Sequence, residues 1–215
     1  MFDAPDLVWL TGDDRDVICS ASDIAITLNG AALHNVANSL AAAALTMSLG
    51  ADLQDVRSGL MSVTQDQNPG RCNVYDVDGR KVLVDFAHNP HAMQALFGMA
   101  QALPAKRRVL CFGQAGDRPD RAIRELAKDA WSIGLDRVHV SELADYHRGR
   151  QSGEVFALIK DELKQHGADE EQIRHFDEEP EALLAALEWA QPGDLVIMLA
   201  LGGAAKIQSL LTPGR

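Results

Sequence analysis

A group of polar residues follows an apolar run near the middle of this chain. The apolar residues 82–84 are followed by Asp85. A short polar turn then leads through His88 and Asn89 to Pro90. The apolar run predicts a buried strand, and Asn-Pro predicts the start of a helix, because asparagine caps helices and proline suits their first position. Ligands of open α/β sheets bind where strands end, and an acidic residue there can accept hydrogen bonds from ribose hydroxyls. We therefore expect a binding turn, although a lone histidine is also often structural.

A second candidate site lies in the first third of the chain, at the start of an alanine-rich helix. Asn35 and Asn38 are spaced so that both belong to the first turns of this helix. An asparagine side chain offers a donor and an acceptor together, which suits the edge of an adenine ring. The alternative interpretation is that one of the two asparagines only caps the helix.

Two arginine motifs could bind anions. Arg71 follows Asn68-Pro69-Gly70, and its planar guanidinium suits phosphate recognition, although it could also be a solvated linker residue. The motif Gly113-x-x-Gly116-Asp117-Arg118 follows a predicted strand and is similar to an anion-binding turn. A Gly-x-x-Gly motif is weak support for such a turn when it stands alone.

Composition and charge exclude several classes of protein. The chain has 215 residues, 47% of them hydrophobic and 24% charged, with a formal net charge of −11. This balance is typical of a globular protein and argues against nucleic-acid binding or attachment to an anionic membrane. No apolar run approaches the roughly 20 residues that a membrane span needs, and no signal peptide is recognisable. We therefore expect a cytoplasmic location, while the sequence leaves a homo-oligomer open.

Several kinds of catalytic site are also disfavoured. The three cysteines, Cys19, Cys72 and Cys111, form no Cys-x-x-Cys pair, so neither a disulfide framework nor a zinc site is indicated. The sequence contains no P-loop, no Gly-x-Ser-x-Gly and no His-Glu-x-x-His motif. We expect no bound metal and no covalent nucleophile in this chain.

The order of the predicted elements indicates an α/β fold. After residue 71, strands alternate with helices, which predicts a Rossmann-like, mostly parallel sheet with helices on both faces. Asp78-Gly79 between two strand-like runs predicts a hairpin that adds an antiparallel edge. The strand-like runs 7–10, 17–19 and 24–28 and two helices precede a polar linker at 64–70. We predict a partial segment over residues 1–68 and an α/β domain over residues 69–215.

Taken together, these motifs resemble the C-terminal portion of the Mur ligase family. Residues 68–73 and 148–155 are most similar to its cyanophycin synthetase branch. The resemblance rests on His34-Asn35-x-x-Asn38, Gly70-Arg71, Asp85-Phe86-Ala87-His88-Asn89-Pro90 and Gly113-x-x-Gly116-Asp117-Arg118.

The resemblance implies an ATP-dependent, Mg²⁺-dependent ligase that forms amide bonds through an acyl phosphate. It also implies that the substrates are a nucleotide and an amino acid or peptide. The implied nucleotide contacts are Asn35, Asn38, Arg71, Asp85, His88 and Asn89, of which Arg71 and His88 would be catalytic. The implied substrate contacts are Asp117, Arg118 and Lys206.

The chain departs from the family pattern in ways that limit this interpretation. It lacks the P-loop, so we expect a fragment that begins within the ATP-binding central domain, leaves the magnesium ligands in the missing part, and is inactive alone. Lys206 stands where enzymes of the murein pathway usually show Gly-Lys-Gly, and residues 142–153 lack an Asp-Asn-Pro-Arg element. Both differences argue against a peptidoglycan substrate. The alternative hypothesis is a non-catalytic module that binds a nucleotide or a partner.

Overall fold

The computed structural model describes residues 1–212 of the chain. The chain divides into two compact units, the first spanning Met1–Cys72 and the second beginning at Asn73. The sequence places the boundary after residue 68, in the polar linker that leads to this division. Each unit is described by itself.

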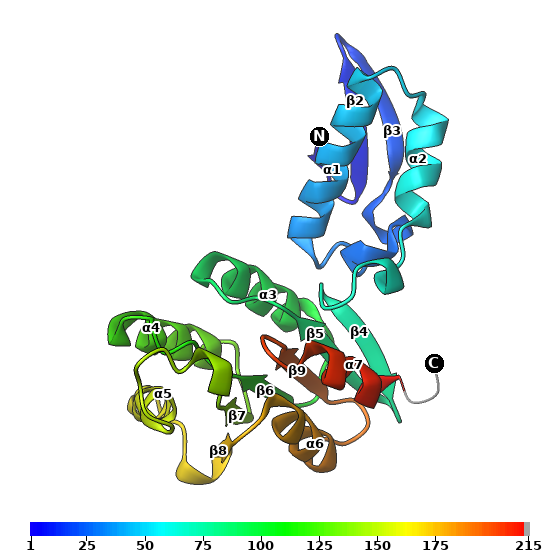
Figure 1. The fold of residues 1–215 in the computed structure, drawn as a ribbon. Helices are drawn as coiled ribbons and strands as arrows, with labels where there is room; N and C mark the ends of the chain where they lie inside the picture. The colour runs from blue at the N-terminus through cyan, green and yellow to red at the C-terminus, as the bar shows by residue number, and fades with distance from the viewer. Residues whose placement is uncertain (213–215) are drawn as a thin grey trace. The chain divides into compact units, whose positions relative to one another are not determined.

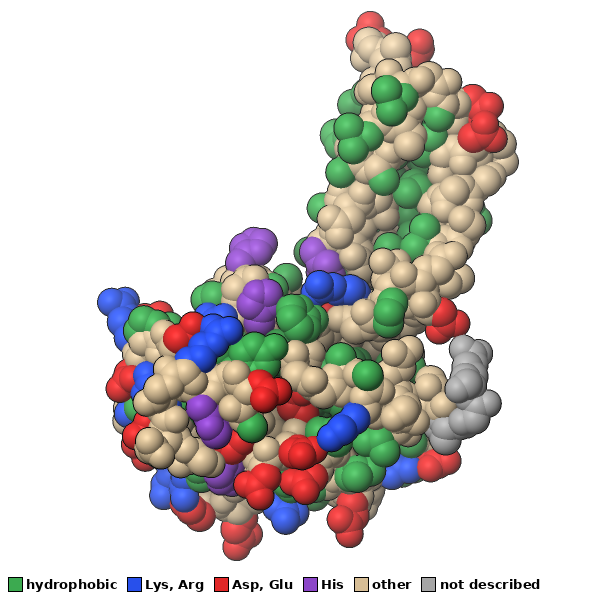
Figure 2. Space-filling model, viewed as in Figure 1, with side chains coloured by type: hydrophobic (Ala, Val, Ile, Leu, Met, Phe, Trp, Pro, Cys, Tyr) green, Lys and Arg blue, Asp and Glu red, His purple; other side chains and the backbone are tan. Residues whose placement is uncertain are grey.

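The N-terminal unit packs helices on a small antiparallel sheet (Figure 1). Its core contains Leu7, Ile18, Val36, Val56 and Leu60. The visible face of this unit shows apolar patches with few charges between them (Figure 2). The elements are β1 (Phe2–Asp3), β2 (Asp6–Thr11), β3 (Asp14–Ser20), α1 (Leu33–Ser48), α2 (Leu53–Ser62) and the 3₁₀ helices η1 (Ala21–Asp23), η2 (Ala25–Thr27) and η3 (Gln65–Gln67).

The strand predicted over residues 24–28 is absent, and this prediction was wrong. Ala25–Thr27 forms a 3₁₀ helix, and Leu28 follows in the left-handed conformation with φ of 53°. The buried hydroxyl of Thr27 donates to backbone carbonyl groups of this turn, among them that of Ile24 at 2.9 Å. The local hydrogen bonds of a threonine outweigh the strand preference of its β-branched neighbours.

The C-terminal unit contains a six-stranded sheet with the order β4-β5-β9-β6-β7-β8. All neighbouring pairs are parallel except β4 and β5, which form the predicted hairpin. Asp78 and Gly79 both have positive φ, as a two-residue hairpin turn requires. The α/β prediction with an antiparallel edge is confirmed. The strands are β4 (Asn73–Val77), β5 (Arg80–Asp85), β6 (Arg108–Phe112), β7 (Arg137–Ser141), β8 (Ile173–Phe176) and β9 (Leu195–Leu199).

Helices cover both faces of this sheet (Figure 1). Helices α6 (Glu179–Trp189) and α7 (Ala204–Leu211) pack against one face through a continuous apolar cluster. The other helices are α3 (Pro90–Ala102), α4 (Asp120–Trp131) and α5 (Glu154–Gln165), which contact one another in sequence order. The part of the chain that the structure describes contains no helix long and apolar enough to cross a membrane.

A buried histidine makes the stability of the C-terminal unit depend on pH. His139 of β7 has no exposed surface, and its Nδ1 lies 3.0 Å from the carbonyl oxygen of Ala182. Burial lowers the pKa of His139 to about 4, from an ordinary value of 6.5. Between pH 6.5 and 4 the unfolded chain therefore binds more protons than the folded one, so stability decreases as the pH falls through this window.

We expect the titration of His139 to lower the free energy of unfolding by about 2 kcal/mol when the pH is lowered from 7 to 5. Urea unfolding of the wild type and of His139→Met at both pH values measures the effect. The substitution removes the titrating group, so the wild type should lose about 2 kcal/mol more than the variant does. Equal losses in the two proteins would contradict the assignment.

Candidate functional site

Two pockets lie at the C-terminal ends of the parallel strands. The first, which we call the arginine pocket, has a volume of about 320 Å³ and is lined by residues that include Arg118 and Arg148. The second, which we call the acidic pocket, has a volume of about 240 Å³. Leu143 and Tyr146 line both pockets, so the two are adjacent. This is the edge at which open α/β sheets bind ligands.

The two arginines that line the arginine pocket have different partners. Arg148 is paired with Asp117 at 2.5 Å, and this hydrogen bond holds the pKa of the Asp117 carboxyl below its ordinary value. The guanidinium of Arg118 donates to the backbone carbonyl group of His88. Among residues 1–212, Arg118 has no acidic side chain within ion-pair distance. A guanidinium with donors to spare beside apolar walls is suited to bind a carboxylate or a phosphate.

Two glycines allow the loop after β6 to pack against the loop after β7. A Cβ atom on Gly113 would lie 2.5 Å from the carbonyl oxygen of Ser141, so only glycine fits there. Gly116 is as tightly enclosed, and its N–H donates to the carbonyl oxygen of Tyr146 at 2.8 Å. Arg150 fastens the same two loops, because its guanidinium donates to the carbonyl oxygen of Gly116 at 2.7 Å. The Gly-x-x-Gly motif thus positions the walls of the arginine pocket.

Glu142 holds the loop after β7 in place, although it belongs to no recognisable sequence motif. Its carboxylate is 8% exposed and accepts a hydrogen bond from the N–H of Gly153 at 3.0 Å. The same carboxylate lies 2.6 Å from Nε2 of His175 and 3.1 Å from Nε2 of His147. Its partners lie 5, 11 and 33 residues further along the chain, and this spacing forms no recognisable sequence motif. Glu142 therefore fixes the segment that supplies Leu143 and Tyr146 to both pockets.

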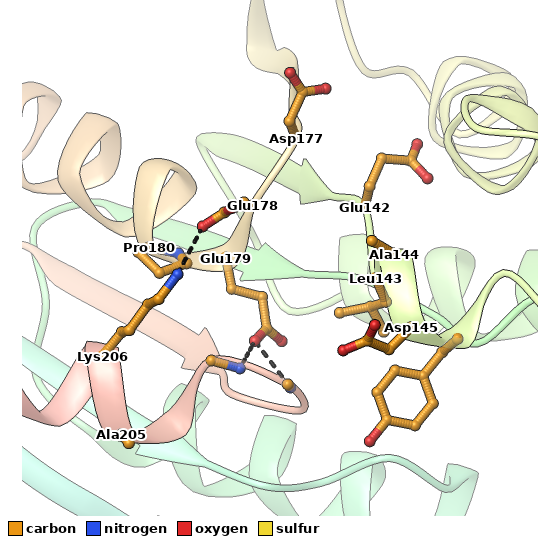
Figure 3. A pocket seen from close by; sticks show the side chains of 13 residues that line it. Glu142, Leu143, Ala144, Asp145, Asp177, Glu178, Glu179, Pro180, Ala205 and Lys206 are labelled. Carbon is orange, nitrogen blue, oxygen red and sulfur yellow. Dashed lines mark hydrogen bonds and ion pairs between the residues drawn. The ribbon is translucent and has the colours of Figure 1, made fainter.

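The acidic pocket gathers carboxylates from two sides (Figure 3). Glu178 and Glu179 lie at the start of α6, and Glu142 and Asp145 lie on the opposite side of the opening. The Glu179 carboxylate is almost fully buried and accepts hydrogen bonds from the N–H groups of Leu201, Gly202 and Gly203. The ionisable residues that line this pocket are Glu142, Asp145, Asp177, Glu178, Glu179 and Lys206.

The predicted substrate residues are divided between the two pockets. Asp117 and Arg118 line the arginine pocket, together with His88. Lys206 lines the acidic pocket, where its Nζ lies 3.2 Å from a carboxylate oxygen of Glu178. Figure 2 shows acidic and basic side chains close to each other on the visible face of this unit.

The turn after β5 has the predicted local structure. Asn89 caps α3, because its side-chain oxygen accepts a hydrogen bond from the N–H of Ala92 at 2.9 Å, and Pro90 occupies the first turn. His88 is exposed, and its ring centroid lies 5.1 Å from that of Phe86. The roles of His88 and Asn89 at a nucleotide stay predictions.

The side chain of Asp85 is buried and bonded to the backbone. The residue is 9% exposed, and its Oδ1 accepts a hydrogen bond from the N–H of Ala87 at 2.7 Å. This bond lets the carboxylate stabilise the turn that it begins.

We therefore expect Asp85→Ala to lower the free energy of unfolding by about 1–3 kcal/mol, since the N–H of Ala87 loses a buried partner. Asp85→Asn keeps an acceptor oxygen at the same place and should cost clearly less. Urea unfolding of both variants measures the difference. An alanine variant as stable as the wild type would show that the bond contributes nothing.

Three of the predicted nucleotide residues, Asn35, Asn38 and Arg71, lie in the N-terminal unit. The side-chain N–H of Asn35 donates to the carbonyl oxygen of Ile26 at 2.7 Å, and that of Asn38 to Oδ1 of Asn35 at 3.3 Å. Ala32 occupies the cap position of α1, so the alternative that an asparagine caps this helix was wrong. Arg71 lies at the end of this unit with an exposed side chain.

No group of three or more histidine, cysteine or acidic residues in the described part of the chain could hold a metal ion.

Comparison with protein families relates most of the C-terminal unit to known enzymes. Residues 70–202 match the family model described as "Mur ligase, glutamate ligase domain". The chain is 33% identical to a cyanophycin synthetase of Crocosphaera subtropica over 182 residues, which cover 83% of this chain and 20% of that protein. It is 28% identical to a UDP-N-acetylmuramate–L-alanine ligase of Chloroflexus aggregans, covering 92% of this chain and 41% of that protein.

Solved structures show the same fold. A bifunctional folylpolyglutamate synthase/dihydrofolate synthase from Yersinia pestis has a TM-score of 0.66 at 21% identity, covering 95% of this chain and 43% of that one. A UDP-N-acetylmuramate–alanine ligase from Thermotoga maritima has a TM-score of 0.59 at 24% identity, covering 83% and 36% of the two chains.

Proposed function

This chain belongs to the Mur ligase family, and we propose that it forms the C-terminal part of an ATP-dependent ligase that joins an amino acid to a carboxylic acid. It spans about a fifth of the length of the cyanophycin synthetases that it matches. The proposal therefore concerns one part of the reaction, the binding and orientation of the amino acid. The proposed enzyme is similar to cyanophycin synthetase.

ATP supplies the phosphoryl group that activates the acid as an acyl phosphate. We propose that Asn35, Asn38 and Arg71 of the N-terminal unit are nucleotide-binding residues. In the C-terminal unit, we propose the same role for Asp85, His88 and Asn89 of the turn that follows β5. Asp85 is the least accessible of these, because its carboxylate is buried and holds the N–H of Ala87. We propose no magnesium ligand within the described residues.

The observation that carries the proposal is the pair of adjacent pockets with opposite charge. Arg118 offers a guanidinium to a carboxylate in the arginine pocket. The acidic pocket on the other side of Leu143 and Tyr146 carries five carboxylates and one lysine. An α-amino acid with a basic side chain matches both pockets, with its carboxylate at Arg118 and its cationic end among the acids. We therefore propose a basic amino acid as the substrate.

Calorimetric titration of the chain with free amino acids tests this function. We expect L-arginine to bind saturably and L-glutamate to bind at least tenfold more weakly. The side chain of L-glutamate is a carboxylate, which the carboxylates of the acidic pocket would repel. Agmatine keeps the guanidinium group of L-arginine but lacks its carboxylate. Comparing the two ligands therefore separates the contribution of the arginine pocket from that of the acidic pocket. Equal binding of L-arginine and L-glutamate, or none of either, would contradict the proposal.

A further inference from the structure

We propose that Gln114 is a substrate-binding residue of the arginine pocket, and that it recognises the amino and carboxylate groups of an α-amino acid together. The inference rests on the proposed function and deepens it, because it names the group that distinguishes an amino acid from another anion. Gln114 occupies an unspecified position of the Gly-x-x-Gly motif, between Gly113 and Gly116, so the motif alone assigns it no role.

The side chain of Gln114 has an unusual environment. Gln114 is 4% exposed and borders the arginine pocket. Neither its Nε2 nor its Oε1 has a hydrogen-bond partner among the described residues. Buried amides are almost always bonded, so an amide with no bond at either end needs an explanation. A ligand that brings both a donor and an acceptor would supply the missing bonds.

The backbone is held in place on both sides of Gln114. Gly113 is packed against the carbonyl oxygen of Ser141, and Gly116 donates to Tyr146 of the opposite loop. These contacts hold the main chain on both sides of Gln114. The amide can therefore gain hydrogen bonds only if its side chain moves. A rotation of the side chain toward the pocket lets the amide reach a bound molecule while the backbone stays in place.

The chemistry of the amide matches that of an amino acid. Nε2 can donate to a carboxylate oxygen, and Oε1 can accept from an amine N–H. Arg118 lines the same pocket and supplies the charge that a carboxylate requires. Arg118 alone would accept any anion of suitable size. Gln114 adds a requirement for an amino group next to the carboxylate, and a neutral acceptor orients that amine without protonating it.

The test uses Gln114→Met, which keeps the length of the side chain and removes both polar atoms. Because the variant no longer buries an unbonded amide, we expect its melting temperature to rise by about 2–4 °C. We expect its affinity for L-arginine to fall by about tenfold, since two hydrogen bonds are lost. Gln165→Met on α5 is the matched control, because Gln165 is exposed and lines neither pocket.

A second titration probe separates recognition of the amino group from recognition of the carboxylate. The deaminated analogue, 5-guanidinopentanoate, keeps the carboxylate and the guanidinium of L-arginine. Wild-type protein should prefer L-arginine to this analogue, and Gln114→Met should lose most of the preference.

The outcomes distinguish the two proposals. Wild-type binding of L-arginine that Gln114→Met leaves unchanged would overturn the role of Gln114 and leave the proposed function standing. A variant that melts below the wild type would also overturn it, because the amide would then be a structural group. If the wild type binds no amino acid, the proposed function fails and this inference fails with it.

Discussion

Arg118→Ala is expected to weaken the binding of L-arginine by about 10- to 100-fold. A hydrogen bond between charged groups contributes about 1.5–3 kcal/mol, and a factor of ten in affinity corresponds to about 1.4 kcal/mol. The effect should be large because Arg118 has no carboxylate within ion-pair distance among residues 1–212, whereas Arg148 is already paired with Asp117. Calorimetric titration of both proteins measures the change.

Arg121→Ala is the matched control for this prediction. Arg121 lies on α4, a few residues after Arg118, and its side chain is 88% exposed and paired with Glu125. Removing it changes the net charge by the same amount but should leave the affinity within about twofold, because an exposed charge is screened by water and salt. Similar losses in both variants would show that the overall charge, rather than the pocket, attracts the amino acid.

Asp194→Ala is expected to lower the free energy of unfolding of the C-terminal unit by about 2–4 kcal/mol, the largest stability loss that we predict. Its carboxylate is 1% exposed and accepts hydrogen bonds from Arg107 at 2.5 Å and from the N–H of Gln191 at 2.8 Å. Burial alone would raise the pKa of Asp194, but the hydrogen bonds from Arg107 and Gln191 outweigh it and lower this pKa. The loss should stay below that of a fully enclosed pair, because Arg107 is 33% exposed.

Urea unfolding of Asp194→Ala tests this prediction, with Asp161→Ala on α5 as the control. The Asp161 side chain is 64% exposed and lies 3.8 Å from Arg124, so its removal should change stability by less than about 0.5 kcal/mol. Because the pKa of Asp194 is lowered in the folded state, its contribution is present at neutral pH and is lost as the pH falls below about 4. Equal stability of the two variants at pH 7 would contradict the predicted role of Asp194.

The α/β fold of the C-terminal unit could be predicted because its signals are local. Asp78-Gly79 specifies a hairpin, Asn89-Pro90 starts a helix, and apolar runs alternate with amphipathic segments. Residues 24–28 show where this reasoning failed. Their β-branched composition favours a strand, but the Thr27 hydroxyl satisfies local carbonyl groups and gives a 3₁₀ turn.

The candidate site was less accessible to sequence reasoning because its partners are distant along the chain. Arg118 and Asp117 stand in a recognisable motif, whereas Glu142 depends on His175 and Gly153, which no spacing connects to it. Gln114 is an uncharged loop residue, and its sequence context does not reveal that it is buried with an unbonded amide. The position of Lys206 in the acidic pocket, apart from Arg118, likewise needed the fold.

The most direct test of the proposed amino-acid site is a two-dimensional amide NMR titration of the full chain with L-arginine. We predict saturable shifts of the amide signals of the loops that line the two pockets, which are residues 114–118, 142–148, 177–179 and 202–206. Saturable shifts confined to other parts of the chain, or none from a folded protein at millimolar L-arginine, would contradict it.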